Sequence, residues 1–214
     1  MRALGSFPDI ATPGKNIACA DDELLHPDFV RHYAGQYENL TAQRIRSPGE
    51  LIRAFYRHNG GHAYAGFKSM PNRHRHYRKF VASGEIRFIT LVRRDIASTV
   101  ASFMVAMLTG CWRRDGGGQA ESWTFDAEAH GPAVAANLDY VLASLDLIAS
   151  IPNAIALAYE DLCREDFNSP ELDGYFGRPI RLADPQPPLH ASAYVTNWPE
   201  FLDFIVGRAH APVP

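Results

Sequence analysis

The chain has 214 residues, 46% of them hydrophobic and 21% charged, which is enough for one α/β domain that buries its own core. A net charge of −3 argues against a general nucleic-acid binder, which carries a basic excess. The three cysteines are scattered and form no CxxC pair, which excludes a disulfide scaffold and a cysteine zinc cluster. No uninterrupted apolar run approaches the roughly 18 residues of a membrane span. The start has no signal-peptide core either, so we expect a soluble cytoplasmic protein.

Three apolar stretches predict buried strands, namely Ala63 to Met70, Ile86 to Val92 and Ala154 to Tyr159. The second stretch is almost continuously apolar, which indicates a parallel strand covered on both faces. The glycine-rich segment Asp115–Gln119 is expected to be a surface loop within the same domain rather than a linker.

Two helical stripes lie between the second and third strands. Apolar residues between Ile96 and Leu108 recur at helical spacing, with Asp95 placed to cap the start and Gly110 to end the helix. The second stripe starts at Pro132, a residue type favoured in the first helical turn, and stops before Pro152.

Shorter helices are expected at Pro48 to His58 and at Pro199 to Gly207. A strand, a helical connection and a second strand at this spacing form a parallel βαβ unit. The predicted fold is therefore a single α/β domain over residues 1–214, with three layers in which helices flank a central parallel sheet.

Two arginines follow the second strand at the point where a helix begins, in the run Leu91-Val92-Arg93-Arg94-Asp95. Ligands bind at the carboxyl ends of parallel strands, and a guanidinium group matches the oxygens of a phosphate. Arg94, Ser98 and Ser102 are spaced four apart, so a hydroxyl on the helix could reach the same anion. Alternatively, the arginines only solvate the turn and pair with Asp95, and spacing alone leaves both interpretations open.

This run, followed by Ser102 and by Thr109-Gly110-Cys111-Trp112, resembles the sulfotransferase superfamily, most closely its bacterial carbohydrate and trehalose 2-sulfotransferase-like branch. In that family the arginine at the strand end and a serine eight or nine residues later hold the 3′-phosphate of the donor PAPS (3′-phosphoadenylyl sulfate). The resemblance assigns these roles to Arg93 and Ser102, with Arg94 as the alternative arginine. It also implies a P-loop-like fold, PAP as the product and no metal.

Other segments agree with the resemblance in the correct order. Gly66-Phe67-Lys68-Ser69-Met70 is similar to the family's second strand, whose lysine points toward the donor, which implies a catalytic role for Lys68. Tyr159-Glu160-Asp161-Leu162 is similar to a signature whose tyrosine lies near the adenine, although Tyr159 could equally pack at the strand end. Tyr194-Val195-Thr196-Asn197-Trp198 resembles a late motif that closes over the nucleotide; alternatively, it anchors the last helix.

The loop that cradles the 5′-phosphosulfate in the family, of the form Arg-Ser-Gly-Ser/Thr-Thr, does not occur in this sequence. Met1 to Ile10 instead resembles the end of the family's first helix and the turn after it. Our hypothesis is that the start is internal and that about 15–30 residues precede it. The competing hypothesis is a family member that has lost sulfuryl transfer.

The usual catalytic base is also replaced, because Lys15 and Met70 occupy the two positions where the family places its glutamate or histidine. Nearby residues that could serve instead are Asp21, Asp22, Glu23 and His62. The basic run Arg73 to Lys79 is either a solvated face or the rim of a site for an acidic acceptor. Its two histidines are too isolated for a metal site.

The predicted function is transfer of a sulfonyl group from PAPS to a hydroxyl of a carbohydrate or glycolipid. The first alternative is a non-catalytic relative that binds a nucleotide or a partner. The second, a nucleotide-dependent kinase, would need a Walker lysine and a magnesium-binding aspartate at a strand end. The expected partner is a small-molecule or glycan acceptor rather than nucleic acid or a membrane, and surface left by a missing N-terminus would allow a homodimer.

Overall fold

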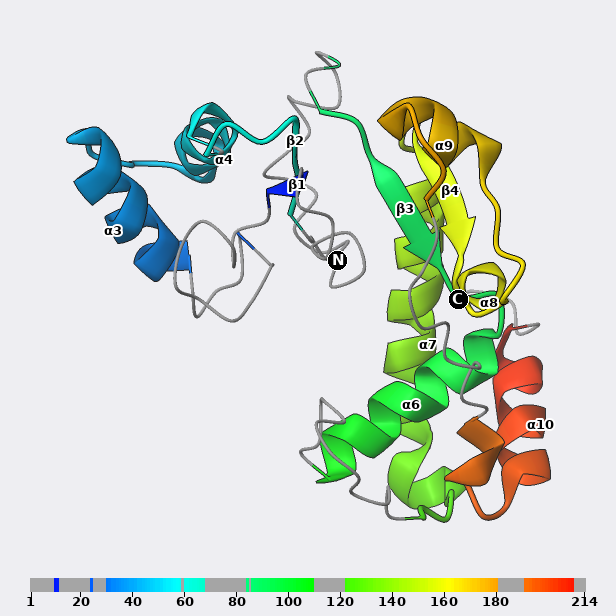
Figure 1. The fold of residues 1–214 in the computed structure, drawn as a ribbon. Helices are drawn as coiled ribbons and strands as arrows, with labels where there is room; N and C mark the ends of the chain where they lie inside the picture. Colours follow the sequence, from blue (N-terminus) through cyan, green and yellow to red (C-terminus); the bar gives the residue numbers. More distant parts are fainter. Residues whose placement is uncertain are drawn as a thin grey trace. The chain divides into compact units, whose positions relative to one another are not determined.

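The computed structural model describes residues 10–11, 24, 30–58, 60–67, 84, 86–109, 122–180 and 191–209. The chain separates into two compact units, Met1–Arg87 and Phe88–Pro214, and each is described by itself (Figure 1). Each unit contains a pair of parallel strands together with helices, so the protein is of mixed α/β class. The expectation of one domain over the whole chain stays a prediction.

In the first unit, β1 (Ile10–Ala11) pairs in parallel with β2 (Tyr64–Ala65). Two helices, α3 (Val30–Thr41) and α4 (Pro48–Arg57), pack against each other. The two helices bury large side chains, which include Tyr33, Tyr37, Leu51, Ile52 and Phe55. The predicted helix from Pro48 is confirmed, whereas α3 was not predicted.

The second unit contains the predicted strand–helix–strand unit. Strand β3 (Ile89–Val92) pairs in parallel with β4 (Ile155–Ala158), with Ile89 opposite Ile155 and Val92 opposite Ala158. Both strands lie inside the predicted stretches and are shorter than expected. Leu91 is 52% exposed, so at this position the described residues do not cover both faces of the strand.

Helices α6 (Ile96–Thr109) and α7 (Ala127–Ala149) connect the two strands. Asp95 caps α6 as predicted, because its Oδ1 accepts a hydrogen bond of 2.8 Å from the backbone N–H of Ser98. The predicted start of α7 at Pro132 is wrong. Asp126 accepts hydrogen bonds from the first-turn N–H groups of Glu128 and Ala129, so the helix begins five residues earlier and Pro132 lies inside it.

The core of the second unit lies where α6 and α7 meet α10 (Trp198–Ala209). Phe201 of α10 is fully buried, and its ring centroid lies 5.4 Å from that of Phe125 and 5.8 Å from that of Trp123. The other buried members of this cluster are Ala97, Val100, Ala101, Met104, Val134, Leu138, Val195 and Ile205. This packing fixes α6, whose N-terminus follows directly from β3.

Helix α7 also has the length and composition of a membrane-spanning helix, with 23 residues and a mean hydropathy of 1.3 over its most apolar window. The sequence shows no uninterrupted apolar run over this helix, because Asp139 and Asp146 divide it. Buried core helices of soluble proteins share it, but only 11% of the apolar window of α7 is buried among the described residues, where α7 packs against α6 and α10.

Short elements complete the second unit. Strand β4 ends one residue before its predicted end, because Tyr159 is the first residue of helix α8 (Tyr159–Leu162). Helix α9 (Pro170–Phe176) ends at Gly177, whose φ of 65° is in the left-handed region that favours glycine. A 3₁₀ turn, η2 (Ala191–Ala193), contacts α6.

Candidate functional site

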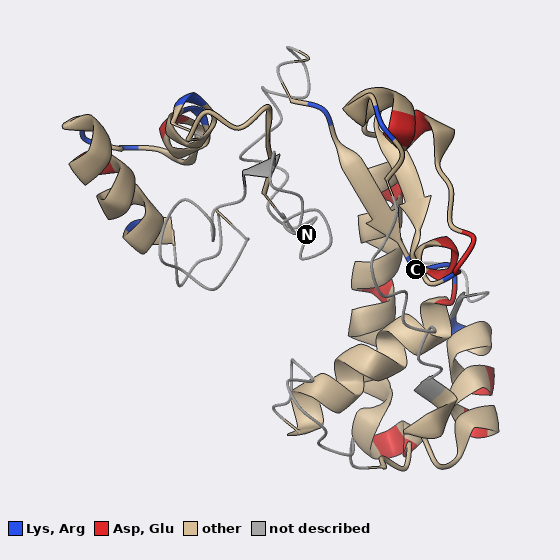
Figure 2. Ribbon diagram, in the orientation of Figure 1, with Lys and Arg blue, Asp and Glu red and all other residues tan. Residues whose placement is uncertain are grey.

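The carboxyl ends of β3 and β4 lie side by side, because Val92 is paired with Ala158. The residues that follow them, Arg93 to Asp95 and Tyr159 to Asp161, therefore share one edge of the strand pair. Figure 2 shows acidic and basic residues gathered around α8, beside the arrowheads of β3 and β4. We call Arg93 to Asp95, Tyr159 to Asp161 and Ser102 the strand-end cluster.

Three of the predicted site residues come together in this cluster. The Nη1 atom of Arg93 lies 3.5 Å from the Oγ atom of Ser102, across nine residues of sequence. The guanidinium carbon of Arg93 lies 5.5 Å from the ring centroid of Tyr159, in a cation–π contact. Ser102 is exposed, and its hydroxyl also donates a hydrogen bond of 2.7 Å to the carbonyl of Ser98. A guanidinium, a hydroxyl and an aromatic ring thus lie at the end of two parallel strands.

Arg94 points elsewhere. Its Nη1 and Nη2 atoms donate to Oδ1 and Oδ2 of Asp161 at 2.9 Å and 2.5 Å, which is a bidentate ion pair. The hydrogen bond and the charge of Asp161 raise the pKa of Arg94. The expected alternative partner, Asp95, caps α6 instead. The two adjacent arginines therefore have different partners, and Arg93 is the one beside Ser102.

Glu160 holds the turn that carries both arginines. Its two carboxylate oxygens accept hydrogen bonds of 3.2 Å from the backbone N–H groups of Arg94 and Asp95. Burial opposes ionisation of this carboxyl, but the backbone N–H donors and the charge of Arg93 outweigh it and lower the pKa of Glu160. In this segment the sequence predicted a site role only for Tyr159, so the roles of Glu160 and Asp161 are seen only in the structure.

Tyr159 is partly buried between the two strand ends. Burial raises the pKa of its phenol, and the nearby thiol of Cys163 raises it further, whereas the charge of Arg93 opposes the shift. The phenol therefore stays neutral at physiological pH, and its ring can serve as a flat apolar surface as well as a partner for Arg93.

Several predicted positions lie outside the described residues. Lys68 is among them, as are Lys15, Met70, most of the Thr109–Trp112 motif and the basic run from Arg73. Within the part of the chain that the structure describes, no three His, Cys, Asp or Glu side chains are grouped so as to hold a metal ion.

The late motif Tyr194–Trp198 serves as an anchor. The side chain of Asn197 accepts a hydrogen bond from the backbone N–H of Phe125 and donates one to its carbonyl, both at 2.8 Å. Val195 forms a parallel bridge with Trp123 in the same segment. These contacts tie the chain before α7 to the start of α10, and closure over a nucleotide stays a prediction.

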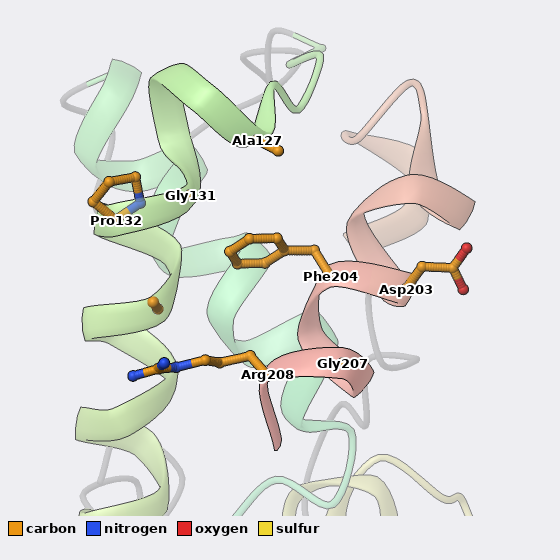
Figure 3. A pocket seen from close by; sticks show the side chains of 8 residues that line it. Ala127, Gly131, Pro132, Asp203, Phe204, Gly207 and Arg208 are labelled. Atoms are coloured by element: carbon orange, nitrogen blue, oxygen red, sulfur yellow. The ribbon is translucent and has the colours of Figure 1, made fainter. Parts of the chain in front are cut away.

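A hollow of about 530 Å³ lies between α7 and α10, apart from the strand-end cluster. It is lined by Ala127, Gly131, Pro132, Ala135, Asp203, Phe204, Gly207 and Arg208. Figure 3 shows Phe204 and Arg208 pointing toward α7, whereas Asp203 turns away. The described residues that line the hollow include none of the predicted site residues.

Comparisons with known proteins give no relative for this chain. No family model matches it, and neither a curated protein nor a solved structure does.

Proposed function

We propose that the protein is a sulfotransferase that transfers a sulfonyl group from PAPS to a hydroxyl of a carbohydrate or glycolipid. The proposal includes a three-layer, P-loop-like arrangement of the whole chain. The observation that carries it is the contact of Arg93 with Ser102 and Tyr159 at the carboxyl end of β3 and β4. This edge is where parallel α/β proteins bind nucleotides.

The chemistry of these three side chains suits a nucleotide that ends in a phosphate monoester. The guanidinium of Arg93 can donate two hydrogen bonds to phosphate oxygens, and the N-terminus of α6 adds a favourable dipole. Because the Arg93–Ser102 contact is long, at 3.5 Å, a phosphate oxygen that binds both groups would replace it with two shorter bonds. In this proposal Arg93 and Ser102 hold the 3′-phosphate, and Tyr159 contacts the adenine.

In the proposed reaction, the oxygen of the acceptor hydroxyl attacks sulfur, and the bond between sulfur and the bridging oxygen of the donor breaks. The electron pair of that bond goes to the 5′-phosphate of the product PAP. Lys68 is proposed to stabilise the negative charge that develops on the bridging oxygen. The proton of the acceptor hydroxyl passes to a base, for which the candidates are Asp21, Asp22, Glu23 and His62.

The proposed function also includes a location in the cell, a partner and an oligomeric state. A cytoplasmic location fits the scattered cysteines of the sequence, of which Cys163 is a free thiol in the structure. The proposed partner is a sugar-containing acceptor, and no metal takes part in the proposed transfer. A homodimer is the assembly to test by sedimentation.

The test is a calorimetric titration of the 214-residue chain with PAP, with adenosine 5′-phosphosulfate as the control that lacks a 3′-phosphate. We expect PAP to bind and the control to bind more weakly. A thermal melt gives a second readout, since a ligand at 100 times its Kd stabilises a protein by about 2.7 kcal/mol. Failure to bind PAP would overturn the proposal. Binding without sulfonyl transfer to a panel of sugars would assign the non-catalytic alternative.

A further inference from the structure

We infer that Arg94 is a second phosphate ligand. It pairs with Asp161 in the unliganded protein and leaves Asp161 for the phosphate when the ligand binds beside Arg93. This inference rests on the proposed function and adds a step of ligand exchange to it. Arg94 would then be a binding residue that the unliganded protein keeps occupied.

The geometry of the Arg94–Asp161 pair supports an exchange. Both guanidinium nitrogens of Arg94 donate to the two oxygens of one carboxylate. Two oxygens of a phosphate present the same fork, so a phosphate can take the place of Asp161 without a change in the hydrogen-bonding pattern.

Only a side chain needs to move in this exchange. The backbone N–H of Arg94 is bound to Glu160, and that of the next residue, Asp95, is bound to the same carboxylate. The turn therefore keeps its conformation while the flexible arm of Arg94 swings. Its neighbour Arg93 leaves the same turn toward Ser102, so both guanidinium groups start from one edge.

Because the Arg94–Asp161 pair is exposed, breaking it costs little free energy. The side chain of Arg94 is 63% exposed and that of Asp161 is 42% exposed. Ion pairs at such sites contribute little, because water and salt screen both charges. A phosphate dianion that is also bound by Arg93 therefore competes with the carboxylate of Asp161 for Arg94, and the phosphate is the stronger ligand.

The charge of the strand-end cluster favours the exchange, because the freed guanidinium places positive charge beside the phosphate. Two arginines stand among three carboxylates, those of Asp95, Glu160 and Asp161. While Asp161 engages Arg94, a dianion would meet a cluster with no excess of positive charge. Release of Arg94 places a second guanidinium against the phosphate and leaves the displaced carboxylate to water.

The test compares PAP binding by calorimetry at low salt in the wild type, D161N, and the double variant R94A/D161N. D161N frees Arg94 in advance, so we expect it to bind PAP about fivefold more tightly than the wild type. R94A/D161N removes the freed ligand, so we expect it to bind at least about tenfold more weakly than D161N. Affinity for adenosine 5′-phosphosulfate, which lacks the 3′-phosphate, should be the same in all three.

A second ion pair of the same kind serves as the matched control. Arg164 donates to both carboxylate oxygens of Asp166 at 2.8 Å, and the two side chains are 63% and 70% exposed. D166N and R164A/D166N make the same changes of charge, and we expect both to bind PAP like the wild type.

Two outcomes would overturn the exchange alone, namely D161N binding no tighter than the wild type, or R94A/D161N binding as tightly as D161N. In either case loss of PAP binding in R93A would leave the proposed function standing. A wild-type chain that does not bind PAP would overturn both proposals together.

Discussion

The guanidinium of Arg93 lies over the ring of Tyr159, with 5.5 Å between the guanidinium carbon and the ring centroid. Arg93 follows β3 and Tyr159 follows β4, so this one contact joins the ends of both strands. It fixes the direction of the guanidinium, whose Nη1 atom faces Ser102. In the proposed complex, a phosphate ligand would therefore meet an arginine that is already oriented.

We predict that R93A abolishes measurable PAP binding while the fold is retained. The substitution removes a guanidinium that can donate two charge-assisted hydrogen bonds, each contributing about 1.5–3 kcal/mol. Calorimetric titration measures the affinity and circular dichroism checks the fold. R164A, which removes an exposed arginine paired with Asp166, should bind PAP normally. Unchanged PAP affinity in R93A would remove the central argument for the site.

We predict that S102A weakens PAP binding by about 1.5–3 kcal/mol, the contribution of one hydrogen bond to a charged group. Binding of adenosine 5′-phosphosulfate should hardly change. S144A is a matched control, because the hydroxyl of Ser144 donates to the carbonyl of Tyr140 at 2.7 Å, as that of Ser102 does to Ser98. Equal losses of affinity in S102A and S144A would show that Ser102 does not bind the ligand.

We predict that E160Q lowers the melting temperature at neutral pH and that this difference disappears in acid. The pKa of Glu160 is lowered in the folded protein from its ordinary value of 4.5. A carboxylate with a lowered pKa stabilises the fold above the unfolded pKa, and this contribution is lost as the pH falls through the folded pKa. Melts of both proteins should differ steadily above the ordinary pKa of 4.5 and converge as the pH falls below it, through the lowered pKa of the folded protein. A gap that persists in acid would mean that the charge of Glu160 is not what holds the turn.

We predict that N197A destabilises the second unit by about 1–3 kcal/mol, because a partly buried peptide group loses its partners. Asn197 bonds to both the N–H and the carbonyl of Phe125. Urea unfolding followed by tryptophan fluorescence measures the change. T196A removes only an exposed hydroxyl pair with Thr124, and it should cost less than about 0.5 kcal/mol. Similar losses in the two variants would contradict the role of Asn197 as an anchor.

We predict that F201A costs about 3–5 kcal/mol in the free energy of unfolding, as expected for a fully buried aromatic side chain. Its neighbour Leu202 is 37% exposed, so L202A should cost far less, since exposed side chains contribute little. Thermal melts of the two variants measure the contrast. A larger loss in L202A would mean that α10 presents a different face to the core.

The sequence by itself determined the order and type of the main elements of the second unit. Apolar residues at helical spacing predicted α6 and most of α7, and short apolar runs predicted β3 and β4. Asp95 was correctly assigned as a cap, because a helix start depends on side chains only a few residues away. The start of α7 was predicted wrongly because both Asp126 and Pro132 are residue types that begin helices. The hydrogen bonds of Asp126 to the first-turn N–H groups show that the helix begins after Asp126.

Only the tertiary structure decided how the strand-end cluster is arranged. The sequence left Arg93 and Arg94 as alternatives at the anion site, because both follow the same strand. Asp161, 67 residues after Arg94, separates them by pairing with the second arginine. Glu160 of α8 fixes their turn, and Asn197 anchors Phe125 across 72 residues. Such contacts depend on strand register and helix packing, and spacing along the chain carries no information about them.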